Sequence, residues 1–140
     1  MDNIVRAREA LQRVLVEIGW ASRDTVAPMR HRIVFGPGAP VSEVIIGIDA
    51  RAQLFLLLAS LRRGAEGVAQ PDLLRLVNRA NWDLMLGNFE MQEQTRAVRF
   101  RCAVHFGDDD LSESAIRRTI ATAMGLIETH AEALAEEAFA

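Results

Sequence analysis

The sequence lacks two residue types on which large classes of chemistry depend. It contains no lysine and no tyrosine, and all 16 of its basic residues are arginine. Without lysine there is no side chain to form a Schiff base and no P-loop lysine to hold a phosphate, so these two kinds of active site are excluded. Cys102 is the one cysteine, so no disulfide can form within the chain and the composition does not favour an oxidising compartment. We therefore expect an intracellular, cytoplasmic protein.

Long apolar runs and excess positive charge are also missing. The longest apolar stretch, 54–59, is too short to cross a bilayer, and no leader-like segment begins the chain, so neither a membrane span nor a secreted protein is expected. The 16 basic residues are outnumbered by 19 acidic ones, giving a net charge of −3, which disfavours binding of a polyanion by the whole domain. The length of 140 residues and the 50% hydrophobic content predict one folded domain, residues 1–140.

Apolar residues spaced by three and four predict three helices. The first covers residues 3–18 and the second begins at Pro71, because proline favours the first helical turn. The buried stripe of the second helix leaves Trp82 on the opposite side. The third helix follows Ser112 as N-cap and continues almost to the end of the chain. The three predicted buried stripes are Ile4, Ala7, Leu11, Val14, Leu15 and Ile18; Leu73, Leu76, Val77, Ala80 and Leu84; and Ile116, Ile120, Ala123, Ile127, Ala131 and Leu134.

β-Branched and alternating segments predict the strands. An irregular strand at 26–36, interrupted by Pro28, precedes a hairpin formed by 41–49 and 52–61, and a short strand at 88–92 precedes a longer one at 98–106. In the last strand the alternation is clear, with arginines on one face and apolar residues on the other. The order α-β-β-β-α-β-β-α predicts an α+β fold with an antiparallel sheet and helices mainly on one face.

The hairpin is apolar on both of its faces. Residues 54–58 are all large and apolar, and Ile45 and Ile46 repeat this pattern in the neighbouring strand. Helices on one side of a sheet leave the other side uncovered, and a large exposed aliphatic patch is uncommon on a soluble monomer. We therefore expect a homodimer packed through the hairpin, with Ile45, Phe55 and Leu57 as its interface.

No arrangement of residues supports catalysis, a metal or a cofactor, so we expect a protein that is not an enzyme. The three histidines do not have metal-site spacing, and Cys102 and His105 point to opposite faces of their strand. Residues 108–110 are three aspartates without the alternating ligands and glycine of a calcium loop, which indicates a solvated turn. Residues 36–38, Gly-Pro-Gly, are not followed by a helix and indicate a hairpin turn.

Arginines at 96, 99 and 101 form the best basic face and raise the possibility of nucleic-acid binding. The aromatic residues of the same strand, Phe100 and Phe106, lie on the apolar face, so no stacking platform accompanies the arginines. Nucleic-acid binding is therefore disfavoured.

Several segments carry a family resemblance. They are the second-helix residues 73–82, the Gly-Asn-Phe-Glu of 87–90, the Arg-Phe-Arg of 99–101 and the Leu-Ser-Glu of 111–113. With them the chain resembles the YbjN family, described as putative bacterial sensory transduction regulators, whose fold is similar to that of type III secretion chaperones. These chaperones are small acidic dimers that hold extended segments of a partner. The resemblance implies a cytoplasmic, non-catalytic regulatory or chaperone-like protein in bacterial signalling or stress response, with no catalytic residues to carry over.

The resulting hypothesis is a homodimeric protein-binding module. Its expected contact patch consists of Asn78, Asn81, Trp82 and Phe89, because Trp82 faces away from the core and polar residues surround it. Two alternatives stay open. One is a small-molecule sensor with a pocket between the sheet and the helices, and the other is an arginine-mediated nucleic-acid binder.

Overall fold

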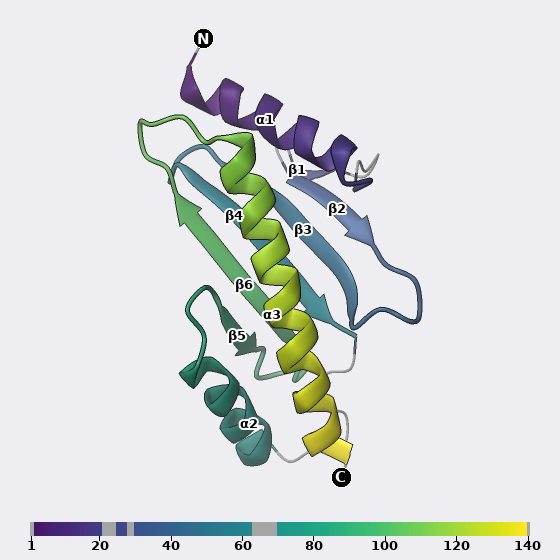
Figure 1. Cartoon of the computed structure of the whole chain (residues 1–140). Coiled ribbons are helices and arrows are strands. Elements are labelled where there is room, and N and C mark those ends of the chain that lie inside the picture. Colours follow the sequence, from purple (N-terminus) through teal and green to yellow (C-terminus); the bar gives the residue numbers. More distant parts are fainter. Residues whose placement is uncertain (1, 21–24, 28–29, 63–69, 140) are drawn as a thin grey trace.

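The computed structural model describes residues 2–20, 25–27, 30–62 and 70–139. Its elements follow the predicted order, with one difference. The irregular first strand expected at 26–36 is two short strands that pair antiparallel, and Pro28 falls outside the described residues. The elements are α1 (Asn3–Glu17), β1 (Thr25–Ala27), β2 (Arg30–Val34), β3 (Val41–Asp49), β4 (Leu54–Leu61), α2 (Gln70–Trp82), β5 (Asn88–Met91), β6 (Val98–His105) and α3 (Glu113–Phe139) (Figure 1).

The strands form one antiparallel sheet with the order β1-β2-β3-β4-β6-β5. The register aligns the apolar sets of neighbouring strands, since Ile46 pairs with Leu57, and Leu57 in turn pairs with Cys102. Side chains of a strand alternate between the two faces, so all three residues lie on one face of the sheet. The expected α+β fold with an antiparallel sheet is confirmed.

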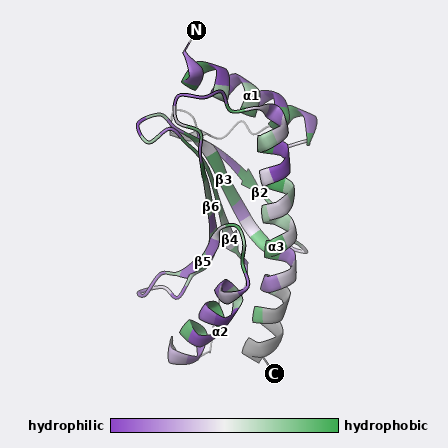
Figure 2. Ribbon diagram, turned by 60° about the vertical axis from the view of Figure 1, so that its left-hand side comes forward, coloured by the Kyte–Doolittle hydropathy of each residue, from purple (hydrophilic) through white to green (hydrophobic). Residues whose placement is uncertain are grey.

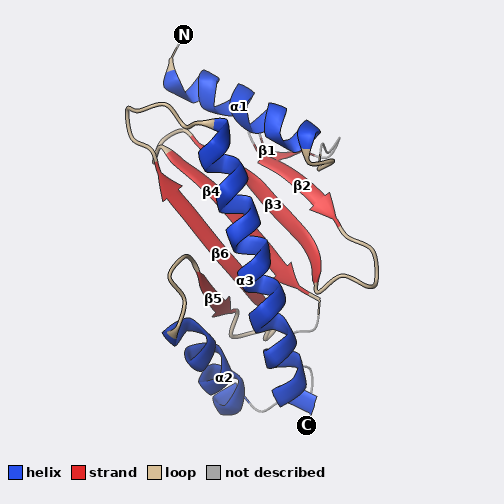
Figure 3. Cartoon of the chain, in the orientation of Figure 1, coloured by secondary structure: helices blue, strands red, loops and turns tan. Residues whose placement is uncertain are grey.

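Helices cover one face of the sheet. In Figure 3, α3 runs lengthwise over the sheet and α1 crosses one end of it. The view in Figure 2 shows α3 on one side of the sheet and no helix along the other. Among the described residues, 27 apolar side chains between these layers form the core, including Leu11, Phe55, Phe100, Ile116 and Ile127. Within the same ranges, no helix has the length and apolar character needed to cross a membrane.

Side-chain caps begin two of the helices. The Asp2 carboxylate accepts hydrogen bonds from the backbone N–H groups of Ile4 and Val5, at 2.8 and 3.0 Å, which satisfies donors that the first turn of α1 leaves unpaired. The predicted N-cap of α3 is confirmed, because the Ser112 hydroxyl accepts from the N–H of Ala115 at 3.0 Å. Both helix starts are therefore specified locally.

One arginine holds the loop between β2 and β3. The guanidinium of Arg62, just after β4, donates to the carbonyl oxygens of Phe35, Gly36, Ala39 and Val41 at 2.8 to 3.2 Å. The predicted turn at 36–38 is confirmed by the hydrogen bond from the N–H of Ala39 to the carbonyl of Gly36. The loop is thus fixed to the end of the neighbouring hairpin strand.

Gly87 lies in the connection between α2 and β5. Its φ of +71° is in the left-handed region that favours glycine. A Cβ at this position would lie 2.5 Å from the Phe100 ring and 2.7 Å from the carbonyl oxygen of Arg101. A side chain here is therefore excluded both by backbone conformation and by the close approach of β6.

Candidate functional site

The face of the sheet that the described helices leave uncovered carries an aliphatic patch, which we call the open face. Its centre consists of partly exposed side chains from the β3–β4 hairpin: Ile45, Leu54, Leu56 and Leu58. Leu56 pairs with Gly47 on one side and with Ala103 on the other. At the centre of the open face the large Leu56 side chain therefore protrudes between two small residues, Gly47 and Ala103.

Charged residues flank the aliphatic centre and pair within the chain. On the β2 side, Arg32 contacts Glu43 at 3.0 Å. On the β6 side, the Glu90 carboxylate accepts hydrogen bonds from both Arg99 and Arg101. Burial acts to raise the pKa of Glu90, but the hydrogen bonds and positive charges of the two arginines outweigh it and hold this pKa below its ordinary value. Two of the three arginines predicted to form a basic face, Arg99 and Arg101, therefore share a carboxylate.

The three residues predicted for a dimer interface lie on different faces. Ile45 is part of the open face, but Phe55 and Leu57 are completely buried beneath the helices. The assignment of Phe55 and Leu57 is therefore corrected, since neither offers surface to a second molecule. Their neighbours Leu56 and Leu58 occupy the open face, because alternate residues of a strand point to opposite sides.

The four residues of the predicted contact patch, three on α2 and Phe89 on β5, are likewise partly exposed and partly buried. Asn78 and Trp82 are exposed, and Trp82 retains 85% of its accessible surface. Asn81 instead faces β5, where its amide accepts from the N–H of Phe89 at 2.7 Å and donates to the Phe89 carbonyl at 3.0 Å. Phe89 itself is buried, with its ring 5.2 Å from that of Phe100. The assignment of Asn81 and Phe89 to a partner surface is therefore corrected, because both are structural.

Sequence reasoning missed two members of the exposed patch. Leu74 lies two turns before Trp82 on α2, and Met85 follows the helix; they are 48% and 97% exposed. Leu74, Asn78 and Trp82 are spaced by four and share one helix face. With Met85 they form what we call the α2 patch. The predicted buried stripe of this helix already excludes Leu74, and its spacing of four residues from Asn78 is the signal that could have placed it in the patch.

The remaining candidates for chemistry have structural roles. Cys102 is buried, which raises the pKa of its thiol, and His105 points from the opposite face of β6. Asp108 accepts from Gln53 at 3.1 Å and Asp110 pairs with Arg6 at 2.7 Å. Within the described ranges no group of three or more potential ligands could hold a metal ion.

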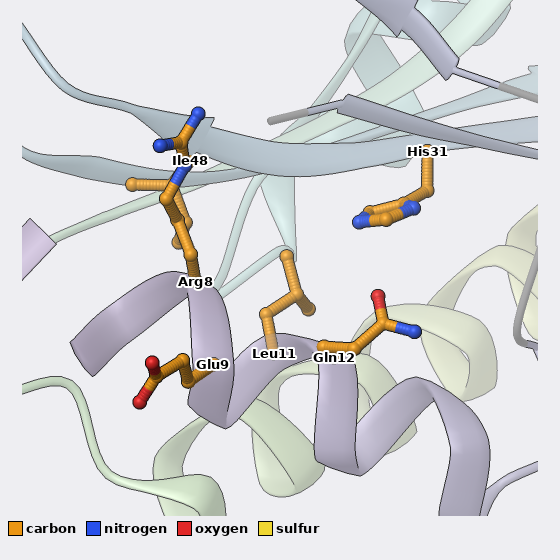
Figure 4. Close-up of a pocket in the computed structure, with 6 residues that line it drawn as sticks. All are labelled: Arg8, Glu9, Leu11, Gln12, His31 and Ile48. Carbon is orange, nitrogen blue, oxygen red and sulfur yellow. The ribbon is translucent and has the colours of Figure 1, made fainter. Parts of the chain in front are cut away.

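A cavity of about 290 Å³ lies between α1 and the edge of the sheet. Its lining comes from one face of α1, from β2 and from the end of β3, and consists of Arg8, Glu9, Leu11, Gln12, His31 and Ile48 (Figure 4). The alternative of a pocket between sheet and helices therefore has a physical counterpart.

The fold is similar to that of several solved structures. One is the crystal structure of the ExsC–ExsE complex, with a TM-score of 0.71 and 18% identity over 96% of this chain and 97% of that chain. Another is the HopA1–SchA chaperone–effector complex, with a TM-score of 0.64 and 11% identity over 91% and 94%. A third is YbjN, a putative transcription regulator from E. coli, with a TM-score of 0.63 and 12% identity over 92% of each chain. At these identities the likeness concerns the fold.

Sequence comparison gives the family. No curated protein matches the chain. The family model of YbjN, described as a putative bacterial sensory transduction regulator, matches residues 7–136. This match includes every strand, the whole of α2 and all but the ends of α1 and α3, and the chain therefore belongs to the YbjN family.

Proposed function

We propose that this chain is a non-catalytic, chaperone-like regulator that binds another protein and acts as a homodimer in the cytoplasm, in bacterial signalling or stress response. The family description supports a regulatory role, and two proteins of similar fold were solved as complexes, one of them a chaperone with its effector. Fold alone does not carry function. The observation that carries this proposal is the uncovered aliphatic centre of the open face.

A second copy of the chain suits the open face in shape. In a twofold-symmetric dimer the same patch of each copy forms the contact. Protruding side chains of one copy must therefore fit beside small residues of the other. Leu56 protrudes between Gly47 and Ala103, and a twofold axis near Leu56 would place each leucine over a small residue of the other copy. Close packing of this kind removes the partly exposed aliphatic side chains from water.

The charges around the open face also suit self-association. Arg32 pairs with Glu43, and Glu90 lies between Arg99 and Arg101. These flanks carry charges of both signs, so two copies can approach without opposing fields of one sign. An isolated row of unpaired arginines would instead favour an acidic partner.

Sedimentation velocity tests the dimer. We expect the wild-type chain to sediment as a dimer at concentrations on the order of 10 μM, and Leu56→Glu to sediment as a monomer, because it places a charge at the centre of the apolar contact. Ser60→Glu is the matched control, since it adds the same charge on the same strand and face at the edge of the patch. A monomeric wild-type protein, or equal association of both variants, contradicts the proposed interface.

We assign the contact with another protein to the α2 patch. Trp82 and Met85 are the most exposed large apolar side chains among the described residues, and aromatic residues and methionine are enriched at protein interfaces. The patch suits an amphipathic segment of a partner that presents an apolar face.

Photocrosslinking in the native host tests the partner site. A photoreactive residue at position 85 should capture one defined protein, and the same residue at exposed position 118 on α3 serves as control. In the chain carrying the photoreactive residue at position 85, Trp82→Ala should abolish capture without lowering the thermal unfolding midpoint, because Trp82 is 85% exposed. Equal capture at both positions, or capture unchanged by Trp82→Ala, contradicts the assignment.

A further inference from the structure

The cavity between α1 and the sheet has an apolar floor with polar groups at its rim. Leu11 and Ile48 are buried and form the floor, whereas Arg8, Glu9 and Gln12 are exposed at the rim. His31 reaches the cavity from β2, on the face of the sheet that α1 covers. Sites for small molecules commonly combine an apolar lining with a few polar groups that fix orientation.

Three nitrogen-bearing side chains surround the cavity. In Figure 4 the Arg8 side chain extends toward β3 beside Ile48, while Gln12 and His31 point toward each other on the other side of Leu11. The same view shows the Glu9 carboxylate directed away from Arg8 and His31. Arg8 and His31 can donate hydrogen bonds to a group in this space, and Arg8 carries a permanent positive charge. The Gln12 amide turns its oxygen toward His31 (Figure 4).

His31 has an unmet hydrogen-bonding requirement. Its Nδ1 atom is buried and has no hydrogen-bond partner among the residues that the structure describes, and burial lowers the pKa of the imidazole. A polar group left buried without a partner is destabilising unless another molecule satisfies it. An anion in the cavity would stabilise the protonated imidazole and so reverse the effect of burial.

We propose that this cavity binds a small organic carboxylate, with Arg8 and His31 directed to the carboxylate and Leu11 and Ile48 in contact with an apolar body. Guanidinium and carboxylate form strong charge-assisted hydrogen bonds. The volume of about 290 Å³ accommodates roughly ten non-hydrogen atoms at ordinary packing density, which suits single-ring or branched-chain acids. The site is separate from the open face and the α2 patch, so it does not depend on the function proposed above.

Isothermal titration with the full chain tests the proposal. Benzoate is the probe and benzamide is its neutral counterpart of the same shape. We expect benzoate to bind with a dissociation constant on the order of 1 mM, and benzamide to bind at least about tenfold more weakly because it lacks the charge that Arg8 recognises. Equal binding of the two probes, or no saturable binding of benzoate up to about 50 mM, overturns the proposal.

Variants locate the binding within the protein. Arg8→Gln and His31→Leu should each weaken benzoate binding about tenfold or more. Arg13→Gln is the matched control, because it removes the same charge from the same helix at a residue that pairs with Glu113 instead, and it should leave affinity unchanged. Circular dichroism confirms that each variant is folded. Retained affinity in Arg8→Gln overturns the assignment.

The pH dependence gives a readout that a purely structural role would not produce. Binding next to His31 should take up a proton, so affinity should rise as the pH falls from 8 to 6, and this dependence should disappear in His31→Leu. Of the described residues, the other charged groups that line the cavity are Arg8 and Glu9, both from α1. An unchanged pH dependence in His31→Leu would overturn the role of the imidazole.

Discussion

Replacement of Gly87 by alanine should destabilise the fold by far more than replacement of a glycine with the same type of backbone conformation. Gly87 and Gly107 both have positive φ, at +71° and +58°. An alanine in this region costs about 1 kcal/mol relative to glycine. At Gly107 no atom of the described residues, apart from the glycine and its two chain neighbours, lies within 4 Å of the new Cβ, so Gly107→Ala should show only this conformational cost.

At Gly87 a steric cost is added. The new Cβ would lie 2.5 Å from the Phe100 ring and 2.7 Å from the backbone oxygen of Arg101. Phe100 is completely buried, so its ring cannot move aside freely, and the carbonyl belongs to β6. Overpacking of this kind costs about 1–3 kcal/mol. The total for Gly87→Ala should therefore be about 2–4 kcal/mol, against about 1 kcal/mol for Gly107→Ala.

Urea denaturation followed by circular dichroism measures the difference. With a slope of about 2 kcal/mol/M for a domain of this size, the midpoint of Gly87→Ala should lie about 0.5–1.5 M below that of Gly107→Ala. Both variants must be compared at one protein concentration, because association would shift the midpoints. Equal urea midpoints of Gly87→Ala and Gly107→Ala would refute the conclusion that β6 leaves no room for a side chain at position 87.

Three further substitutions test other contacts. Asn81→Ala should lower the free energy of unfolding by about 1–3 kcal/mol, since the backbone of Phe89 loses two hydrogen bonds; an unfolding midpoint in urea equal to that of the wild type would contradict this. Glu90→Gln should flatten the acid dependence of stability. The folded-state pKa of Glu90 lies below its ordinary value of 4.5, so its contribution is present above that value and is lost as pH falls through the folded pKa. Urea midpoints at pH 7 and pH 3 should therefore differ less in the variant than in the wild type. His31→Leu should raise the melting temperature by about 3 °C, because it removes the unpartnered Nδ1; a lowered melting temperature would contradict this prediction.

Much of the fold could be predicted from the sequence because, in several segments, the spacing of apolar residues is compatible with one type of secondary structure and one buried face. The alternation in β6 separates arginines from apolar residues, and the structure places Phe100 and Cys102 in the core and Arg101 outside. The stripe of α3 is likewise buried from Ile116 to Ala131. In these elements a single amphipathic pattern determines the buried face.

The candidate sites could be predicted only in part, because the register of strand pairing decides which of their residues point toward the helices and which toward the open face. Residues 54–58 are apolar at every position, so periodicity does not identify which of them point to the helices. Pairing with β6 decides this, since Leu57 lies opposite Cys102 and Leu56 opposite Ala103. Phe89 is similar: its strand spans only Asn88–Met91, and its place opposite Phe100 follows from a contact between strands. Prediction of the cavity at His31 would require the position at which α1 crosses the sheet, and this position cannot be derived from the local sequence.

The way in which Arg62 holds the β2–β3 loop has a consequence for how this loop can change. Among the described residues, its guanidinium donates to main-chain oxygens, those of Phe35, Gly36, Ala39 and Val41. Carbonyl groups are common to all residue types, so these hydrogen bonds do not depend on which side chains most positions of the loop carry. The loop can therefore acquire new surface chemistry by substitution while keeping its path, provided that its length and the arginine are retained.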